Sequence, residues 1–257
     1  MVRRVAVISD VHGVLPALDA VLAEPDLRDA EVVVVTGDIA AGPQPGEVLD
    51  RLGALGERAL VVRGNADRDL VSIARDGHTP DGTPPIDVWA AGRLTAEHVR
   101  TLEALPHPVV LTLDGVGEVV FCHGSPRDDN EVVLVDTRLS RWSEVLSELP
   151  DSVRMVVCGH THMPFARLVD RRWVVNSGSI GMPYGSHGLP WALLTGNGVH
   201  LRWTSIDPDS LADEVVAACS YPQIEEWTDT YLRHPPSDSD AVLAFGPRDA
   251  RRADWNG

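Results

Sequence analysis

Five apolar segments of this chain are each followed at once by side chains that can bind a metal ion. In chain order, these side chains are Asp10, His12, Asp38, Asn65, His123, His160 and His162. Together they offer two carboxylates, one amide and four imidazoles. Such a set buried without a cation would be destabilised by desolvation and by repulsion between like charges. The pattern therefore predicts a metal site.

Each of these positions also has a simpler explanation when it is taken alone. Asp10 could cap the helix that follows it. Asp38 and Asn65 each follow a glycine and could be turn residues. His123 could be a hydrogen-bonded histidine at the start of a loop, and the H-x-H pair at 160–162 is by itself a weak metal signal. The metal prediction depends on all of them occurring together at the ends of apolar segments.

The types of ligand narrow the choice of metal. The set combines oxygen and imidazole nitrogen donors and contains no cysteine. These donors suit manganese, iron, zinc or nickel, and they differ from the ligands of a typical structural zinc site. Seven ligands are too many for one ion, whereas two divalent or trivalent ions that share a carboxylate accommodate them. Paired ions about 3.5–4 Å apart recur in enzymes that hydrolyse phosphoesters. We therefore expect a dinuclear centre, with manganese favoured in vitro.

The first part of the chain alternates buried strands with helices. Strands are expected at 3–10, 31–38 and 58–65, and helices at 14–25 and 46–56. This order predicts parallel strands joined by right-handed helical crossovers. The carboxyl ends of such strands meet at one edge of a sheet, where functional sites assemble. The polar residues are therefore expected to converge at that edge.

The later part of the chain predicts a second group of strands. The expected elements are a loop at 76–87, helices at 89–105 and 138–149, a hairpin around 114–115, a strand at 152–160 and short strands over 166–204. Tight turns join the strands of 166–204, so we expect that part to be antiparallel.

These elements together predict an α/β fold. We expect a four-layer α/β/β/α sandwich, in which two mixed sheets pack face to face and are flanked by helices. Residues 1–206 would form one domain, with a helical, cap-like insertion at about 76–105. Residues 207–233 are expected to form one or two peripheral helices. Residues 234–257 are rich in Pro, Asp and Arg without periodicity, so a loosely ordered tail is expected there.

Composition limits the range of partners. The formal net charge is −16, which repels nucleic acid and anionic membranes, so neither duplex binding nor membrane binding is expected. No apolar stretch approaches the roughly 20 residues that span a bilayer, and no targeting segment is recognised, so we expect a cytoplasmic protein. The three cysteines fit a reducing compartment. A small phosphate substrate stays compatible with the acidic surface, because bound cations reverse the charge locally.

The order D-x-H, G-D, G-N, H-G, G-H-x-H closely resembles the calcineurin-like metallophosphoesterase superfamily. The resemblance covers about residues 3–204, and all five motifs are present in order. The segment NSGSIGMP at 176–183 is also similar to the segment that follows the last histidines in the family. The general form resembles the bacterial and archaeal phosphodiesterase branch.

The resemblance implies a role for each ligand. Three residues would hold each ion, and one carboxylate would bridge the two ions. The first metal would be held by Asp10, His12 and His162, the second by Asn65, His123 and His160, and the bridge would be Asp38. A hydroxide between the ions would attack phosphorus in line with the leaving oxygen. Asp38, Asn65 and His123 would then be the residues at the centre of catalysis.

Ala66 departs from the family pattern. Many members carry a histidine after G-N, and that histidine donates a proton to the leaving group, whereas this chain reads GNAD. General acid catalysis is typically worth about 10²–10⁴-fold, so its loss favours substrates with good leaving groups. The sequence therefore favours a phosphodiesterase, with 2′,3′-cyclic nucleotides as one candidate substrate.

Three other residues could contact substrate or replace the missing acid. Asp67 is adjacent, although it could instead cap the next helix. His187 follows the last motif on a loop that could reach the metals. Arg127 could clamp a phosphate, or it could form a salt bridge with the acidic pair at 128–129.

The same ligand set is compatible with other functions. A phosphomonoesterase or a nucleotide pyrophosphatase would use the same metal centre. A non-catalytic scaffold of the same fold would explain Ala66, but it would have no evident need for seven ligands. A small phosphoester is the expected partner, a nucleotide being one candidate, and the sequence does not indicate the oligomeric state.

Overall fold

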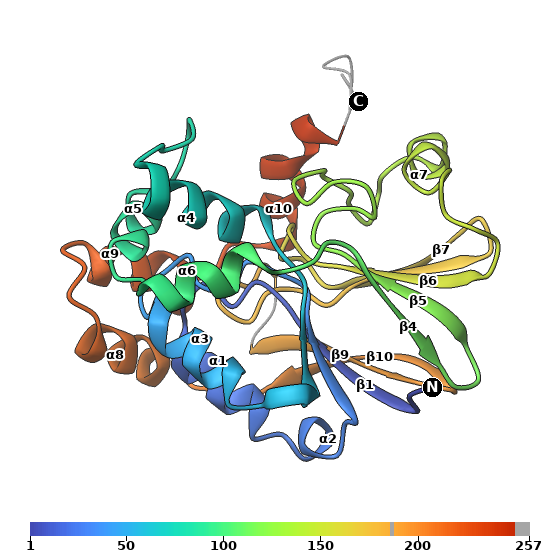
Figure 1. Ribbon diagram of the computed structural model, residues 1–257, viewed down its shortest axis with the longest axis horizontal. Coiled ribbons are helices and arrows are strands. Elements are labelled where there is room, and N and C mark those ends of the chain that lie inside the picture. The colour runs from blue at the N-terminus through green and yellow to red at the C-terminus, as the bar shows by residue number, and fades with distance from the viewer. Residues whose placement is uncertain (186–187, 250–257) are drawn as a thin grey trace.

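Two five-stranded sheets face each other in the computed structural model, which describes residues 1–185 and 188–249 (Figure 1). The first sheet has the strand order β10-β9-β1-β2-β3. Its strands are β1 (Arg4–Ile8), β2 (Val32–Val35), β3 (Ala59–Val61), β9 (Leu189–Thr195) and β10 (Gly198–Thr204). The second sheet has the order β4-β5-β6-β8-β7. Its strands are β4 (Val109–Leu113), β5 (Gly117–Phe121), β6 (Val153–Cys158), β7 (Phe165–Val169) and β8 (Arg172–Asn176).

The parallel part of the first sheet follows the predicted strand–helix alternation. Strands β1, β2 and β3 are parallel neighbours, and α1 (Leu15–Leu22) and α3 (Pro45–Gly53) lie in the two connections. Three of the four valines of β2 are buried, as expected for a strand covered on both faces. Strands β9 and β10 extend this sheet in antiparallel pairing.

The second sheet is mixed, as predicted, but the segment 166–204 is not purely antiparallel as expected. The hairpin predicted around 114–115 is present as the antiparallel pair β4–β5, and β7–β8 is antiparallel as well. Strand β8, however, pairs in parallel with β6, and β5 also pairs in parallel with β6. The turns within 166–204 predict only hairpin partners, whereas β6–β8 pairing joins strands that are not adjacent in the chain.

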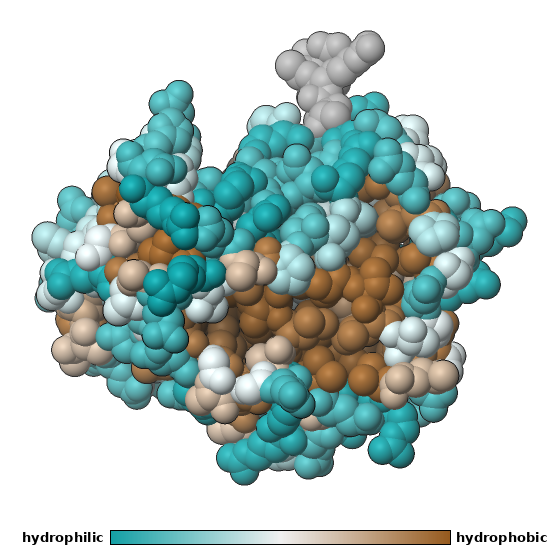
Figure 2. All heavy atoms as spheres, in the orientation of Figure 1, coloured by the Kyte–Doolittle hydropathy of each residue, from teal (hydrophilic) through white to brown (hydrophobic). Residues whose placement is uncertain are grey.

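Three hydrophobic clusters fill the layers. Val7, Val34 and Phe121 belong to the cluster between the sheets. Leu18 of α1 belongs to the cluster on the outer side of the first sheet, and Trp142 to the one outside the second sheet. Figure 2 shows hydrophobic side chains gathered in the middle of one face, in the region where Figure 1 draws β4. The predicted four-layer sandwich of two mixed sheets flanked by helices is confirmed.

The remaining helices lie around the sheets. They are α2 (Pro25–Arg28), η1 (Gly56–Arg58), α4 (Asn65–Asp76), α5 (Pro85–Ala91), α6 (Ala96–Glu103), α7 (Leu139–Val145), α8 (Pro208–Ala218), α9 (Ile224–Thr228), η2 (Asp229–Arg233), α10 (Asp238–Phe245) and η3 (Gly246–Arg248). Helices α5 and α9 lie side by side at one end of the molecule (Figure 1). None of the helices among the described residues is long and apolar enough to cross a bilayer.

The segment 234–249 differs from the expected loose tail. It contains α10 and η3, and Ala241 of α10 is fully buried in the cluster outside the second sheet. Thr137 also donates a hydrogen bond to Asp249 at 2.7 Å. A short amphipathic segment that docks on a preformed core leaves little periodicity in the sequence, because few of its residues are buried. Residues 250–257 lie outside the described part.

Candidate metal centre

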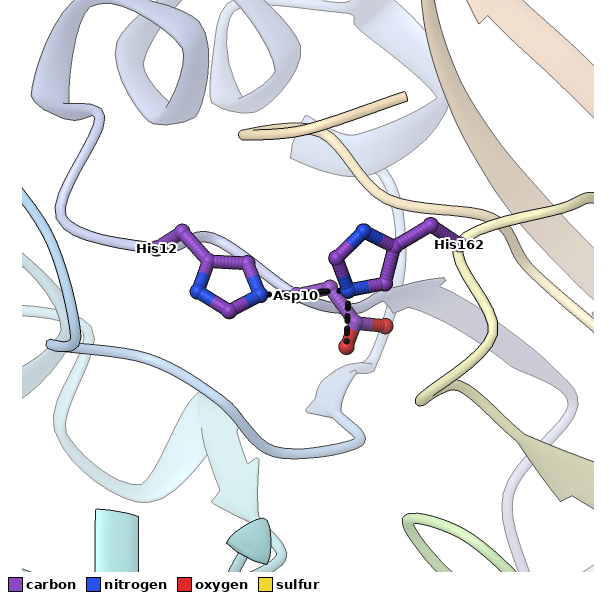
Figure 3. A group of neighbouring side chains, drawn as sticks. All are labelled: Asp10, His12 and His162. Atoms are coloured by element: carbon purple, nitrogen blue, oxygen red, sulfur yellow. Dashed lines mark hydrogen bonds and ion pairs between the residues drawn. The ribbon is translucent and has the colours of Figure 1, made fainter. Parts of the chain in front are cut away.

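Six of the seven predicted ligands converge in two buried groups. The first group is Asp10, His12 and His162, and the second is Asp38, His123 and His160. Within each group the potential ligand atoms all lie within 4.8 Å of one another. Figure 3 shows the first group, in which both imidazole rings and the Asp10 carboxylate point toward one another. The convergence predicted from the strand ends is therefore observed.

The loops that carry these residues adopt an uncommon backbone conformation. Five of the seven predicted ligands have a positive φ, a region that non-glycine residues seldom occupy. Their φ values are 51° for Asp10, 46° for His12, 52° for Asp38, 66° for His160 and 57° for His162. Backbone strain of this kind persists where the surrounding structure enforces it, and it is concentrated at functional sites.

Two glycines allow these loops to approach each other. Gly37 precedes Asp38 and has φ +97°, and a Cβ there would lie 2.7 Å from the His123 ring. A Cβ on Gly64 would lie 2.1 Å from the Asp38 carboxylate. The glycines in the G-D and G-N motifs are thus needed for close packing around Asp38.

Backbone carbonyls orient three of the four imidazoles. The Nδ1 atoms of these rings face carbonyl oxygens at 3.1 Å for His12 and Ala41, 2.6 Å for His123 and Thr36, and 2.9 Å for His162 and Met182. Because Nδ1 then carries the proton, each Nε2 presents a lone pair to the centre. The two Nε2 atoms of His12 and His162 lie only 3.2 Å apart, and a cation between these lone pairs would stabilise that arrangement.

The two carboxylates lie between the groups. Asp38 Oδ2 is 3.2 Å from His123 Nε2 in its own group and 3.9 Å from His12 Nε2 in the other. Asp10 Oδ1 is likewise 3.3 Å from His162 Nε2 and 3.9 Å from His123 Nε2. Either carboxylate can therefore contact ligands of both groups.

The electrostatics of the centre are those of closely packed charged groups. Burial alone would lower the pKa of His123, but the adjacent carboxylates of Asp38 and Asp10 raise it to about 10. The same contact with His123 outweighs burial and holds the pKa of Asp38 well below its usual range. Burial, and then the neighbouring His123, lower the pKa of His160 to about 3. Without a cation, the carboxylates depend on a protonated imidazole for compensation.

Asn65 is the seventh predicted ligand. It is the first residue of α4, and its side-chain Oδ1 is buried with no hydrogen-bond partner in residues 1–185 and 188–249. The Nδ1 atom of His160 is buried and unpartnered in the same described residues. Buried acceptors are normally hydrogen-bonded, so these two free lone pairs fit a site for transition-metal ions.

Asp67 fixes the position of the bridging candidate. Its carboxylate accepts hydrogen bonds from the backbone N–H groups of Asp38 at 2.9 Å, Ile39 at 2.8 Å and Gly64 at 2.9 Å. Burial and the charge of Asp38 raise the pKa of Asp67 to about 7. Asp67 does cap α4, but from the third position of the helix, because Gly64 is the N-cap residue. Ala66 contributes its own N–H to Asp38 Oδ1 at 2.8 Å.

The segment after β8 supports the H-x-H loop. Asn176 donates to the carbonyl of Gly159 at 2.6 Å and to the Thr161 hydroxyl at 3.1 Å. Ser179 donates to the Asp10 carbonyl at 2.7 Å. The N-S-G-S residues thus join the last ligand loop to the first, which explains why that segment accompanies the metal motifs.

The C-terminal segment reaches the centre, and the sequence analysis missed it. The Phe245 ring lies 5.8 Å from the His160 ring and 6.4 Å from the His162 ring. Arg248 Nη2 lies 3.4 Å from His160 Nε2 and donates to the Asn130 carbonyl at 3.1 Å. Among the described residues no carboxylate pairs with Arg248. The only sequence signal was an arginine in a segment without periodicity.

Two other predicted contacts have different outcomes. The Arg127 guanidinium binds Glu131 at 2.7 Å and Glu144 at 3.1 Å. It therefore forms a salt bridge, but not with the acidic pair at 128–129 that the sequence suggested. Asp129 instead accepts from Arg63 at 3.1 Å. His187 lies outside the described residues.

Comparison with known families accounts for this geometry. A family model described as the calcineurin-like phosphoesterase superfamily domain matches residues 4–196. The chain belongs to the calcineurin-like phosphoesterase superfamily. This membership confirms the resemblance seen in the motifs and places the chain among phosphoester hydrolases.

Relatives of this phosphoesterase come from archaea and bacteria. It is 26% identical over 200 residues to protein MJ0912 of Methanocaldococcus jannaschii, covering 70% of this chain and 76% of that one. It is 25% identical over 198 residues to phosphodiesterase YfcE of Escherichia coli, covering 72% and 84%.

Solved structures show the same fold. Protein PH1004 of Pyrococcus horikoshii superposes with a TM-score of 0.74 at 22% identity, covering 90% of this phosphoesterase and 99% of that chain. A metallophosphoesterase from Sphaerobacter thermophilus gives a TM-score of 0.68 at 23% identity, covering 89% and 99%.

Proposed function

We propose that this phosphoesterase is a dinuclear-metal phosphodiesterase. The observation that carries the proposal is the pair of buried groups, in each of which imidazole nitrogens and a carboxylate oxygen lie within 4.8 Å of one another. The residues that would hold the metals are Asp10, His12 and His162 for one ion, Asn65, His123 and His160 for the other, and Asp38 for both. Mn²⁺ is the ion we would supply first, and iron, zinc or nickel would suit the same donors.

The chain's own residues would bind and orient the phosphoryl group. Two such ions, when bound, supply electrophilic activation and a water of lowered pKa. Asp38 lies between the two groups, and Asp67 holds it there through the backbone. Arg248 presents a guanidinium beside His160 and would bind a phosphoryl oxygen, a pairing that guanidinium groups favour.

The preference for diesters rests on the residues beside Asn65. Ala66 has no proton to donate, and the Asp67 oxygens are occupied by three backbone N–H groups. A substrate with a good leaving group needs less acid assistance. Activated diesters and 2′,3′-cyclic nucleotides meet that requirement better than alkyl monoesters do.

The test is hydrolysis by purified protein supplied with Mn²⁺. We expect faster turnover of bis(p-nitrophenyl) phosphate than of p-nitrophenyl phosphate, and measurable turnover of 2′,3′-cyclic nucleotides. Asp38→Ala should abolish all of these activities, and retained activity would refute the site. A faster monoester or pyrophosphate reaction would favour those alternatives, and a protein that binds no metal at micromolar concentration would favour the scaffold.

A further inference from the structure

A cavity opens beside the metal centre, between α5 and the α9–η2 segment. Its volume is about 330 Å³, and His12 and Met182 form the part of its wall that adjoins the first metal group. Met182 is also the residue whose carbonyl orients His162. A phosphodiester bound at the metals would therefore have one of its two ester groups next to this cavity.

The charge of the cavity wall is negative. Asp87 of α5 and Glu226 of α9 both line it, and no arginine does so among the described residues. Neither carboxylate has a hydrogen bond or an ion pair within the described part of the chain. The chain has 38 acidic and 22 basic residues, so unpaired carboxylates are common on it, but these two lie together in the wall of a cavity.

The rest of the wall is aromatic and apolar. Tyr221, Trp227 and Tyr231 line the cavity together with Met182. The Trp227 and Tyr231 rings lie 5.3 Å apart with their planes tilted by 53°. Tyr231 is half-buried, whereas Tyr221 and Trp227 are each 8% exposed. Aromatic rings combined with unpaired carboxylates are the surroundings that bind quaternary ammonium groups.

We propose that this cavity binds an ammonium group carried by one alcohol of the phosphodiester substrate. The inference rests on the proposed function, since it names the substrate class of the same centre. The phosphoryl group would lie at the metals, and the cation would lie between Asp87, Glu226 and the aromatic rings. An anionic group in the same place would meet two carboxylates without a counter-charge.

The environment of Asp87 supports this assignment. Burial, and then the charges of Asp38 and Asp69, raise the pKa of Asp87 to about 7. A bound cation would favour the ionised form and offset that cost. An uncharged nucleoside would use the aromatic wall but would leave the Asp87 carboxylate unpaired.

The test compares two chromogenic diesters of nearly equal shape. One is p-nitrophenyl phosphorylcholine, and the other is p-nitrophenyl 3,3-dimethylbutyl phosphate, in which carbon replaces the charged nitrogen. We expect kcat/KM to favour the choline ester by about tenfold, the size of a desolvated cation–π and ion-pair contact. Asp87→Asn and Glu226→Gln should each bring the ratio toward one. Glu225→Gln, a neighbouring carboxylate outside the cavity wall, is the matched control and should leave the ratio unchanged.

Binding of choline to the metal-free protein, measured by calorimetry, gives a readout that does not need catalysis. We expect binding that Asp87→Asn weakens about tenfold and that 3,3-dimethylbutanol does not reproduce. If bis(p-nitrophenyl) phosphate is hydrolysed but the kcat/KM of the choline ester does not exceed that of the 3,3-dimethylbutyl ester, this inference alone is overturned. If no diester is hydrolysed with any metal, the proposed function fails, and absence of choline binding would then overturn the inference separately. A kcat/KM for 2′,3′-cyclic nucleotides above that for the choline ester would also overturn it.

Discussion

At the scale of single residues, the candidate metal centre contains side-chain atoms that have no hydrogen-bond partner among the described residues. Asn65 Oδ1 and His160 Nδ1 are buried without hydrogen-bond partners in the described chain. A backbone carbonyl fixes the tautomer of His123 so that its Nε2 faces Asp38 at 3.2 Å. The residue types of this centre were predictable from the sequence, because metal chemistry restricts the choice of ligand. Their tautomers and free lone pairs were not predictable, because they depend on carbonyls and other groups from distant parts of the chain.

Ala66 is the first residue whose substitution tests the chemistry. Ala66→His should increase monoesterase activity by about tenfold or more, because it restores a proton donor beside the bridging candidate. The backbone N–H that binds Asp38 is retained in the histidine and asparagine variants. Rates with p-nitrophenyl phosphate and an alkyl monophosphate measure the gain, and Ala66→Asn serves as a polar control without an acidic proton. If the histidine variant gains nothing, the missing acid is not what limits monoester hydrolysis.

Arg248 is the second such residue. Arg248→Met should raise KM for the diester and weaken competitive inhibition by inorganic phosphate, each about tenfold, with a smaller change in kcat. Arg127→Met is the matched control from the same surface, because Arg127 is already paired with Glu131 and Glu144. Steady-state kinetics at several phosphate concentrations measure both effects. An increase in kcat/KM would instead mean that the C-terminal segment obstructs the centre.

At the scale of elements, the strands and their loops have different origins. Apolar runs and helical spacing predicted β1, β2 and β6 and their helical connections, because burial is a local demand on each segment. The parallel β6–β8 pairing and the docking of α10 beside His160 depend on contacts between distant parts of the chain. Local patterns do not record such contacts. The positive φ values of the ligand loops also have tertiary causes, such as the close approach of Gly37 and Gly64.

Asp67 tests how one helix positions a loop of the neighbouring strand. Asp67→Asn places an NH₂ group against backbone N–H groups that now donate to a carboxylate. Each unsatisfied buried donor costs about 1–3 kcal/mol, so we expect unfolding in urea at a lower midpoint and a diesterase activity at least tenfold lower. Asp69→Asn, on the same helix, is the control, because within residues 1–185 and 188–249 the Asp69 side chain pairs only with the adjacent Arg68, at 3.3 Å. Unchanged stability and activity in Asp67→Asn would show that Asp38 holds its position without this contact.

At the scale of the whole molecule, the centre joins the two sheets. Asp10, Asp38 and Asn65 follow strands of the first sheet, whereas His123, His160 and His162 follow strands of the second. The hydrophobic core between the sheets is shared by both, so the sheets are expected to unfold together. Ions bound by both sets of ligands would stabilise only the folded arrangement, because the unfolded chain does not bring those ligands together.

Metal binding should therefore raise the melting temperature of the entire molecule. At a free metal concentration of 100 times Kd, linkage predicts about 2.7 kcal/mol of added stability. For a chain of this size, each kcal/mol shifts Tm by about 2–4 °C, so we expect a rise of about 5–10 °C on adding Mn²⁺ to EDTA-treated protein. Calorimetry should show a single transition in both states. In Asp38→Asn, which removes the carboxylate proposed to bind both ions, the shift should largely disappear, whereas Asp50→Asn, which changes an exposed carboxylate on α3, should retain it. Two separate transitions, or a metal-induced shift confined to one of them, would show that the ions do not couple the two sheets.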